Sequence, residues 1–278
     1  MEWCRVVLLA VAVTLVGGAS AYAQDGGDYG DGNVRARLVT DTNLTEPGTS
    51  IRLGVYFEIK PGWHIYWHNP GGAGLATEIQ WRLPEGFHAG DLQWPLPIFF
   101  EQSDGIPGYG YEDSVILAST VVVPAAAAGR VTVAAEVSWL ACKGVCVLGS
   151  ASLEGGLGEI ADPAAFEKWS TTLPLGLDPE EAPFALRTTG GLGEQRLTLW
   201  LQWRQPPDKV EWFPAPPDSL EVTNVRVQNR AGLTRIDSDV RPMAGVTPTS
   251  DLFNSLVVAT SADGERRGWE LEVELDDN

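Results

Sequence analysis

Several segments of this chain alternate apolar and polar residues with a period of two, and this pattern limits the possible folds more than any other feature. The clearest segment is 51–59, where every second residue is Ile, Leu, Val or Phe. Similar alternation occurs in residues 34–38, 197–203 and 269–276. Side chains of a strand point alternately to opposite faces, so each segment is expected to form a strand with one buried face.

The remaining sequence also favours β-structure. Residues 115–123 and 131–140 are rich in β-branched side chains, and residues 222–227 form another expected strand. Proline and glycine are frequent in residues 61–110, which predicts loops and short strands there. Many short strands separated by turns indicate an all-β protein built from β-sandwiches.

A single helix is expected, at residues 162–169, where an aspartate suits the N-cap and a proline suits the first turn. We place this helix in a linker at residues 161–182. The linker is expected to join two β-sandwich domains, the first at residues 34–160 and the second at residues 183–278.

The first 23 residues have the three-part pattern of a secretory signal peptide. A short head is followed by an apolar run at residues 6–16 and by small residues that end at Ala23. Cleavage there removes Cys4 and leaves a flexible tail rich in glycine and aspartate at residues 24–33. No later stretch reaches the ~20 apolar residues of a membrane-spanning helix, so the mature chain is expected to be exported without a transmembrane segment.

The acidic composition argues against one class of partner. The chain has 37 Asp and Glu residues against 19 Lys and Arg residues, a formal net charge of -18. Such a charge repels the phosphates of nucleic acids, so no nucleic-acid partner is expected. No phosphate-binding loop or Ser-His-Asp pattern occurs in the sequence, and no cofactor is expected.

Two cysteines remain after cleavage, Cys142 and Cys146, and their spacing is informative. In a continuous strand their Cα atoms would be about 13 Å apart, whereas a disulfide needs less than about 7 Å. If they pair, the chain must turn between them. Residues 143–145 contain a glycine that suits such a hairpin loop.

Three interpretations of this pair stay open on spacing alone. Exported proteins use disulfides as structural staples, but closing so small a loop stabilises a fold by only about 2 kcal/mol. Strained small loops exchange more readily, and Lys143 favours a neighbouring thiolate, which supports a redox role. The third interpretation is a soft-metal site completed by His64, His68 or His88. We expect these histidines to be loop or core residues instead, and no metal site.

Several uncommon motifs that contain tryptophan or glycine follow one another in the first half of the sequence. Residues 61–71 read PGWHIYWHNPG, and residues 79–87 contain IQW and LPEGF. Residues 93–95 read QWP and residues 108–112 read GYGYE. Residues 139–146 read WLACKGVC. Together these stretches resemble the N-terminal periplasmic domain of the thiol:disulfide interchange protein DsbD, and residues 139–146 are similar to the redox site of that family.

The resemblance covers about residues 34–155. Residues 183–278 resemble, more weakly, the second β-domain of the ScsB-like branch. The resemblance implies two immunoglobulin-like β-sandwich domains after a cleaved signal peptide. It also implies that Cys146 forms the mixed disulfide with a partner and that Cys142 resolves it.

The resemblance further implies a loop that shields the cysteine pair from oxidation. Its expected counterpart lies at residues 108–112, with Tyr109 or Tyr111 as the covering ring, and the alternative is that both rings are ordinary packing residues. Family members usually carry a membrane domain and a thioredoxin-like domain, for which this sequence shows no counterpart. The protein is therefore expected either to work with a separate, membrane-embedded electron donor or to serve as something other than a reductase hub.

We thus expect a periplasmic thiol–disulfide exchange protein, acting as a protein-disulfide reductase or interchange component. It would pass reducing equivalents through a Cys142/Cys146 dithiol from the membrane-embedded donor to exported disulfide-bearing proteins. The alternative is a non-enzymatic periplasmic binding module, either a copper carrier or an interaction domain, whose cysteine pair is only structural.

Overall fold

A computed structural model gives the fold of this protein. The signal peptide expected at residues 1–23 lies outside the described residues, as does nearly all of the tail expected at residues 24–33. Within the described ranges the protein forms eighteen strands and one helix, which confirms the expected all-β class. The described ranges are 32–43, 46–102, 105–127, 129–178, 181–248 and 250–275.

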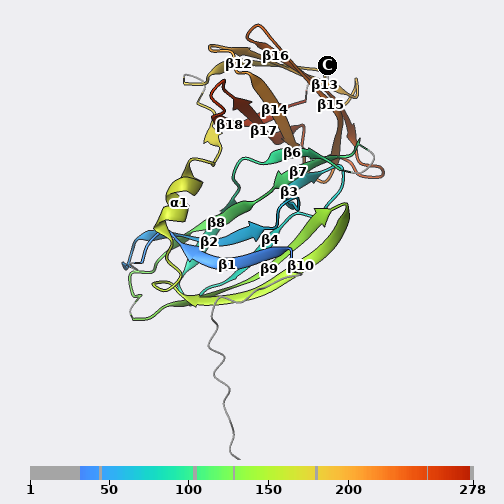
Figure 1. The fold of residues 1–278 in the computed structure, drawn as a ribbon. Helices are drawn as coiled ribbons and strands as arrows, with labels where there is room; N and C mark the ends of the chain where they lie inside the picture. The colour runs from blue at the N-terminus through green and yellow to red at the C-terminus, as the bar shows by residue number, and fades with distance from the viewer. Residues whose placement is uncertain are drawn as a thin grey trace, which may run out of the picture.

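The first half of the chain forms a β-sandwich with an additional small sheet (Figure 1). One main sheet has the order β1 (Val34–Thr40), β2 (Ser50–Ile59), β8 (Ser114–Val122) and β5 (His88–Gln93). The other main sheet has the order β10 (Val145–Gly156), β9 (Thr132–Lys143) and β4 (Glu78–Arg82). The additional sheet, which we call the side sheet, has the order β3 (Ile65–Gly71), β7 (Pro107–Tyr111) and β6 (Ile98–Glu101).

The core of this first sandwich follows from the period-two pattern. All five alternating apolar residues of β2 are buried in one hydrophobic cluster with the inward residues of β1, β8 and β9. Trp139 on β9 is 2% exposed, and its ring meets the ring of Phe57 on β2 edge-on at 5.7 Å between centroids. The two main sheets are therefore held together by large side chains that each strand turns inward.

The second half forms another β-sandwich, with two sheets. One sheet has the order β11 (Leu175–Gly176), β18 (Arg266–Glu274), β17 (Leu252–Thr260) and β14 (Lys209–Ala215). The other has the order β12 (Phe184–Thr189), β13 (Arg196–Trp203), β16 (Leu233–Pro242) and β15 (Leu220–Arg230). The rings of Phe184, Trp203 and Trp269 pack edge-on against one another between the sheets, with centroids 4.7–6.0 Å apart.

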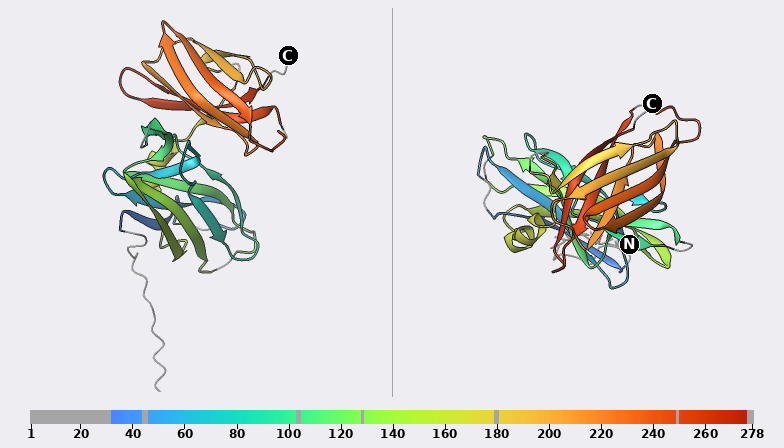
Figure 2. Two further views of the ribbon diagram at one scale, coloured as in Figure 1. Left: turned by 90° about the vertical axis from the view of Figure 1, so that its right-hand side faces the viewer. Right: turned by 90° about the horizontal axis from the view of Figure 1, so that it is seen from above.

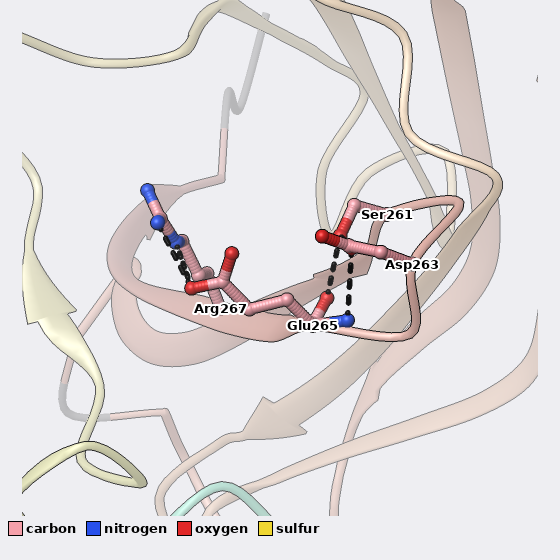
Figure 3. A network of polar contacts seen from close by, with 4 residues as sticks. All are labelled: Ser261, Asp263, Glu265 and Arg267. Carbon is pink, nitrogen blue, oxygen red and sulfur yellow. Dashed lines mark hydrogen bonds and ion pairs between the residues drawn. The ribbon is translucent and has the colours of Figure 1, made fainter.

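A turn in the second sandwich shows how short polar side chains order a connection. Between β17 and β18, Ser261 donates a hydrogen bond from Oγ to Asp263, which also accepts from the backbone N–H of Glu265 at 3.3 Å (Figure 3). The Ser261 hydrogen bond is the main reason that the pKa of Asp263 lies below its usual value. Arg267 then pairs with the Glu265 carboxylate at 2.9 Å.

The expected helix is present as α1 (Pro163–Ser170). Asp162 is its N-cap and accepts a hydrogen bond from the Ala165 N–H at 3.2 Å, as expected for a capped first turn. Phe166 and Trp169 bury the inner face of the helix against the first sandwich, where the Trp169 indole N–H donates to a backbone carbonyl of β8. The segment between the sandwiches is thus attached to both, since β11 pairs with β18 in the second sandwich.

The two sandwiches lie against each other, as two views show (Figures 1 and 2). The hydrophobic cluster of the first sandwich includes Phe213 from β14, and Leu256 and Val258 from β17. These three side chains are 0–3% exposed. One sheet of the second sandwich therefore buries residues on both of its faces, one face in its own core and the other against the first sandwich.

Candidate functional site

The cysteine pair lies at the tip of the β9–β10 hairpin. Cys142 is opposite Cys146 in the antiparallel register, and Lys143 is opposite Val145. Gly144 makes the turn with a φ of 70°, a conformation that a residue without a Cβ adopts at no steric cost. This confirms the turn at residues 143–145 that a pairing of the two cysteines requires.

A disulfide joins Cys142 and Cys146, whose Cα atoms are 4.1 Å apart. The backbone explains why they are so close. Cys142 exchanges both of its backbone hydrogen bonds with His64, which precedes β3, so its N–H and C=O point away from β10. Cys142 and Cys146 are therefore a non-hydrogen-bonded pair, the kind in which antiparallel strands bring opposite side chains closest.

The two sulfur-bearing residues differ strongly in their exposure. Cys142 is 3% exposed, whereas Cys146 is exposed to solvent. Leu148 is 72% exposed and lies two residues beyond Cys146 on β10, opposite the half-buried Leu140. Val145 is 65% exposed beside it. The reachable cysteine is thus flanked by exposed apolar side chains, which is typical of a surface that meets another protein.

Tyr66 on β3 contacts the buried sulfur. Its hydroxyl lies 3.2 Å from Cys142 Sγ and 2.9 Å from Gln102 Oε1. Gln102 is oriented by a hydrogen bond from its own Nε2 to the carbonyl of Ala73. Burial raises the pKa of Tyr66 above its ordinary value, so the hydroxyl keeps its proton and remains a donor. It donates to one acceptor at a time, and a thiolate at Cys142 would be the stronger acceptor.

Two further rings pack beside Tyr66. The His64 ring lies 3.9 Å from the ring of Phe100 on β6 and 5.4 Å from the ring of Tyr66. We call His64, Tyr66 and Phe100 the cover. Burial lowers the pKa of His64 to about 4, and its Nε2 has no hydrogen-bond partner. His64 is therefore neutral near pH 7 and contributes no positive charge to the site.

Glycines make room for the cover. A Cβ on Gly108 of β7 would lie 2.2 Å from the Phe100 ring, and a Cβ on Gly74 would lie 2.4 Å from the Tyr66 ring. A Cβ on Gly110 would lie 2.0 Å from the carbonyl oxygen of Ile65. Such separations are far inside van der Waals contact. The glycines of residues 108–112 therefore serve the packing of the side sheet that carries the cover.

The two tyrosines expected as covering rings lie elsewhere. Tyr109 and Tyr111 are 4% and 5% exposed within the hydrophobic cluster of the first sandwich. Tyr109 packs against Phe213, and the Tyr111 hydroxyl donates to the carbonyl of Pro95. Burial raises the pKa of Tyr109 to about 12. The ring that contacts Cys142 is Tyr66, which belongs to the motif at residues 61–71 and for which the sequence alone indicates no role.

The strand period of β3 and its pairing with β7 explain how Tyr66 is placed, although this pairing cannot be read from the sequence. His64 precedes β3 and Tyr66 lies within it two residues later, so both side chains are placed on one face. Gly110 is opposite Tyr66 in the register of β3 and β7. A large residue that faces a glycine across two strands is typical of a ring lying over a neighbouring strand.

The remaining polar residues near the site bring no metal-binding group together. His68 packs against Trp67 and Trp94, and His88 lies on β5. Across the described ranges, no three His, Cys, Asp or Glu side chains are arranged to hold a metal ion. The Lys143 ammonium donates to the carbonyl of Pro61 at 3.0 Å and so ties the hairpin tip to the turn before β3.

Comparisons with known proteins agree with this geometry. Residues 35–156 match the family model described as thiol:disulfide interchange protein DsbD, N-terminal. The structure is similar to the crystal structure of the N-terminal periplasmic domain of ScsB from Proteus mirabilis, with a TM-score of 0.66 and 20% sequence identity. That match covers 90% of this chain and 95% of the ScsB domain, so the likeness of fold includes both sandwiches.

Other solved structures are much less similar to this chain. A protein of unknown function from Porphyromonas gingivalis W83 aligns over 88% of this chain and 100% of that chain, at 9% identity and a TM-score of only 0.20. No curated protein sequence matches the chain. α1 has eight residues, and the described ranges contain no helix with the length and apolar character that a bilayer crossing demands.

The family match and the cysteine hairpin together identify residues 35–156 as an immunoglobulin-like domain of the DsbD N-terminal family.

Proposed function

We propose that this protein is a periplasmic thiol–disulfide exchange protein and that Cys142 and Cys146 carry the exchange. The observation that supports this most is the asymmetry of the pair, with an exposed Cys146 and a covered Cys142 in a domain of the DsbD N-terminal family. Thiol–disulfide exchange needs one sulfur that a partner can reach and a second that completes the reaction inside the molecule.

Reduction of the pair begins at Cys146. A thiolate of the electron donor attacks Cys146 Sγ, the bond to Cys142 breaks, and Cys142 leaves as a thiolate. The Tyr66 hydroxyl, 3.2 Å away, can then donate its hydrogen bond to this thiolate. A second thiolate of the donor then attacks the donor sulfur of this mixed disulfide, and Cys146 leaves as a thiolate. The cysteine pair is now reduced, and the donor, with a disulfide of its own, is oxidised by two electrons.

Transfer to a target runs the same chemistry in the other direction. The Cys146 thiolate attacks a disulfide of the target and forms a mixed disulfide, while one target sulfur leaves as a thiolate. The Cys142 thiolate then attacks Cys146 Sγ, which re-forms the internal disulfide and releases the second target sulfur. The chemistry uses only the sulfurs and solvent protons, so no cofactor takes part.

The partners we propose are a membrane-embedded thiol electron donor and exported proteins that carry disulfides. The similar ScsB domain is a periplasmic domain, and the expected signal peptide is consistent with the same compartment here. The exposed side chains of Val145 and Leu148 beside Cys146 would contact either partner. An apolar surface that small suits brief encounters rather than a stable complex.

The test is to trap the mixed disulfide. A Cys142→Ser variant is expressed in the periplasm and examined by non-reducing electrophoresis. It should accumulate covalent adducts with partner proteins, which dithiothreitol cleaves by reduction, because the resolving thiolate is missing. The matched control is Cys146→Ser, which should form few adducts because the remaining sulfur is covered. Adducts of the first variant should disappear in the double variant.

The alternative, a purely structural cysteine pair, gives different results. Neither single variant would trap a partner, and the wild-type disulfide would resist reduction by a thioredoxin-like donor. Those two results together would contradict the proposed function.

A further inference from the structure

The second sandwich contacts the side sheet, the sheet that carries two rings of the cover. Phe213 on β14 is fully buried, and its ring lies edge-on to Tyr109 of β7 at 5.2 Å and to Trp67 of β3 at 6.1 Å. The Asn69 side-chain amide at the end of β3 donates to the carbonyl of Pro214. Figure 1 shows β3, β6 and β7 at the junction between the two sandwiches.

A second contact reaches the start of β6. Arg266, at the start of β18, donates from Nη2 to the carbonyl of Pro97 at 2.7 Å. Pro97 directly precedes β6, which carries Phe100. A Cβ on Gly268 would lie 2.3 Å from the side chain of Leu96, so the backbone of β18 comes very close to this segment. The second sandwich therefore holds both β3 and β6.

The two faces of the side sheet have different neighbours. Tyr109 and Tyr111 belong to the face that meets Phe213 and the hydrophobic cluster. Gly108 and Gly110 alternate with them along β7, so they belong to the opposite face. That opposite face lies under the cover, since Gly108 is in contact distance of Phe100 and Gly110 is opposite Tyr66. The side sheet is thus clamped between Phe213 and the cover of Cys142.

We propose that the second sandwich acts as a clamp on the cover, with Phe213 as the positioning residue that keeps Cys142 inaccessible. The cover can move away from Cys142 only if β3, β6 and β7 shift. The packing around Phe213 opposes that shift because a large ring fully enclosed by neighbours cannot yield without leaving a void. Access to Cys142 is therefore coupled to the interface between the sandwiches.

The experiment measures access to each sulfur separately in the reduced protein. Iodoacetamide is added under native conditions, and site-resolved peptide mass spectrometry follows carboxamidomethylation, in which each thiolate displaces iodide. In the Phe213→Ala variant we expect alkylation of Cys142 to accelerate roughly tenfold, within the ~5–150-fold range typical of coupling between two sites. Alkylation of Cys146, which is already exposed, should change little. The readout needs no biological partner, so its outcome is independent of the proposed function.

The matched control is Phe253→Ala on β17. Phe253 is also buried in the second sandwich, at 3% exposed, but it faces that sandwich's own core and not the interface. Its truncation should leave Cys142 alkylation near the wild-type rate. Equal acceleration by Phe213→Ala and Phe253→Ala would overturn the proposal, because it would indicate general loosening. A folded Phe213→Ala protein with wild-type alkylation of Cys142 would also overturn it.

If Phe213→Ala does not fold, a milder variant tests whether the second sandwich restricts access to Cys142. Arg266→Ala removes the hydrogen bond to Pro97 while leaving the ring packing in place. Because a single hydrogen bond is lost, we expect Cys142 alkylation to rise by about threefold. A wild-type rate in the folded Arg266→Ala variant would then overturn the proposal.

Discussion

The two sandwiches are built alike but differ by one sheet. Each packs two main sheets around aromatic side chains, and each buries the inward residues of alternating strands. The first sandwich has the side sheet of β3, β7 and β6 in addition, and the described part of the second sandwich has no equivalent. Both cysteines of the disulfide and all three histidines of the chain also belong to the first sandwich.

This difference supports placing the proposed exchange site in the first sandwich. A hairpin with two cysteines is an ordinary structural feature in an exported protein. The side sheet makes the hairpin asymmetric, because it places Tyr66, with Phe100 packed beside it, against one cysteine and leaves the other exposed. The second sandwich has no reactive sulfur, and its contribution is to support that side sheet.

The largest expected effect concerns the glycine on which the side sheet depends. Gly110→Ala would place a Cβ 2.0 Å from the Ile65 carbonyl oxygen, a backbone atom that cannot swing aside. We expect the free energy of unfolding to fall by about 3 kcal/mol, the upper part of the range for overpacking. Chemical denaturation would measure it. Gly193→Ala in the second sandwich, where a Cβ meets nothing within 4 Å, should change stability by less than ~0.5 kcal/mol. Similar losses in the free energy of unfolding for both variants would contradict this difference between the two sandwiches.

A second prediction concerns the hydroxyl at the buried sulfur. Tyr66→Phe keeps the ring but removes the hydrogen bond to Cys142, and a hydrogen bond to a charged group contributes about 1.5–3 kcal/mol. We expect reduction of the disulfide by dithiothreitol to slow by roughly tenfold, because Cys142 leaves as a less stabilised thiolate. Stopped-flow or acid-quench kinetics would measure this.

The matched control for that variant is Tyr109→Phe. Tyr109 lies in the same sheet but packs away from the cysteines, against Phe213. Its reduction rate should equal that of the wild type. If dithiothreitol reduced the disulfide more slowly in Tyr109→Phe than in Tyr66→Phe, the ring that acts on Cys142 would belong to residues 108–112.

Much of this fold is predictable from the sequence, and the reasons are local. The alternation in residues 51–59 and 197–203 indicates β2 and β13, and the aspartate at position 162 indicates the N-cap of α1. The turn around Gly144 follows from the distance between two cysteines. In each of these cases, neighbours in sequence decide the structure.

The cover cannot be predicted in the same way. The sequence correctly predicts loops and short strands in residues 61–110, but their pairing into a side sheet depends on contacts between distant segments. Tyr66 and Cys142 are 76 residues apart, and Phe213 reaches the same sheet from the other sandwich. Such contacts leave no periodic trace in the sequence, so the motifs alone point to Tyr109 or Tyr111 as the ring beside the sulfur.

A third prediction concerns the surface beside the exposed cysteine. Leu148→Ser removes an apolar side chain that is 72% exposed, so the free energy of unfolding should change by less than ~0.5 kcal/mol. Exchange with a protein disulfide should slow several-fold, by about 1 kcal/mol, while exchange with glutathione should not. Leu252→Ser on the second sandwich, at 41% exposed, is the control and should leave both rates unchanged. An equal effect of Leu252→Ser would mean that the partner surface is not confined to the hairpin.

A last expected effect is a pH dependence of the stability of the first sandwich. Burial lowers the pKa of His64 to about 4 in the folded protein, below its ordinary value of 6.5. The unfolded chain therefore binds more protons between these values, so the free energy of unfolding should fall as the pH drops from about 6.5 to about 4. Urea denaturation at a series of pH values would measure the slope. Burial lowers the pKa of His68 to about 4 as well, so His64→Gln should remove only about half of this slope. The double variant His64→Gln/His68→Gln should flatten it, and an unchanged slope in the double variant would contradict this prediction.

The most direct test of the whole account compares the two sulfurs with the same small disulfide. The reduced Cys142→Ser and Cys146→Ser variants are mixed with oxidised glutathione under native conditions, and mass spectrometry follows the formation of each mixed disulfide. We predict that Cys146 in the first variant reacts at least about tenfold faster than Cys142 in the second, equivalent to ~1.4 kcal/mol for moving the cover aside. Equal rates, or faster reaction at Cys142, would contradict the assignment of Cys146 as the exchanging sulfur and Cys142 as its covered partner.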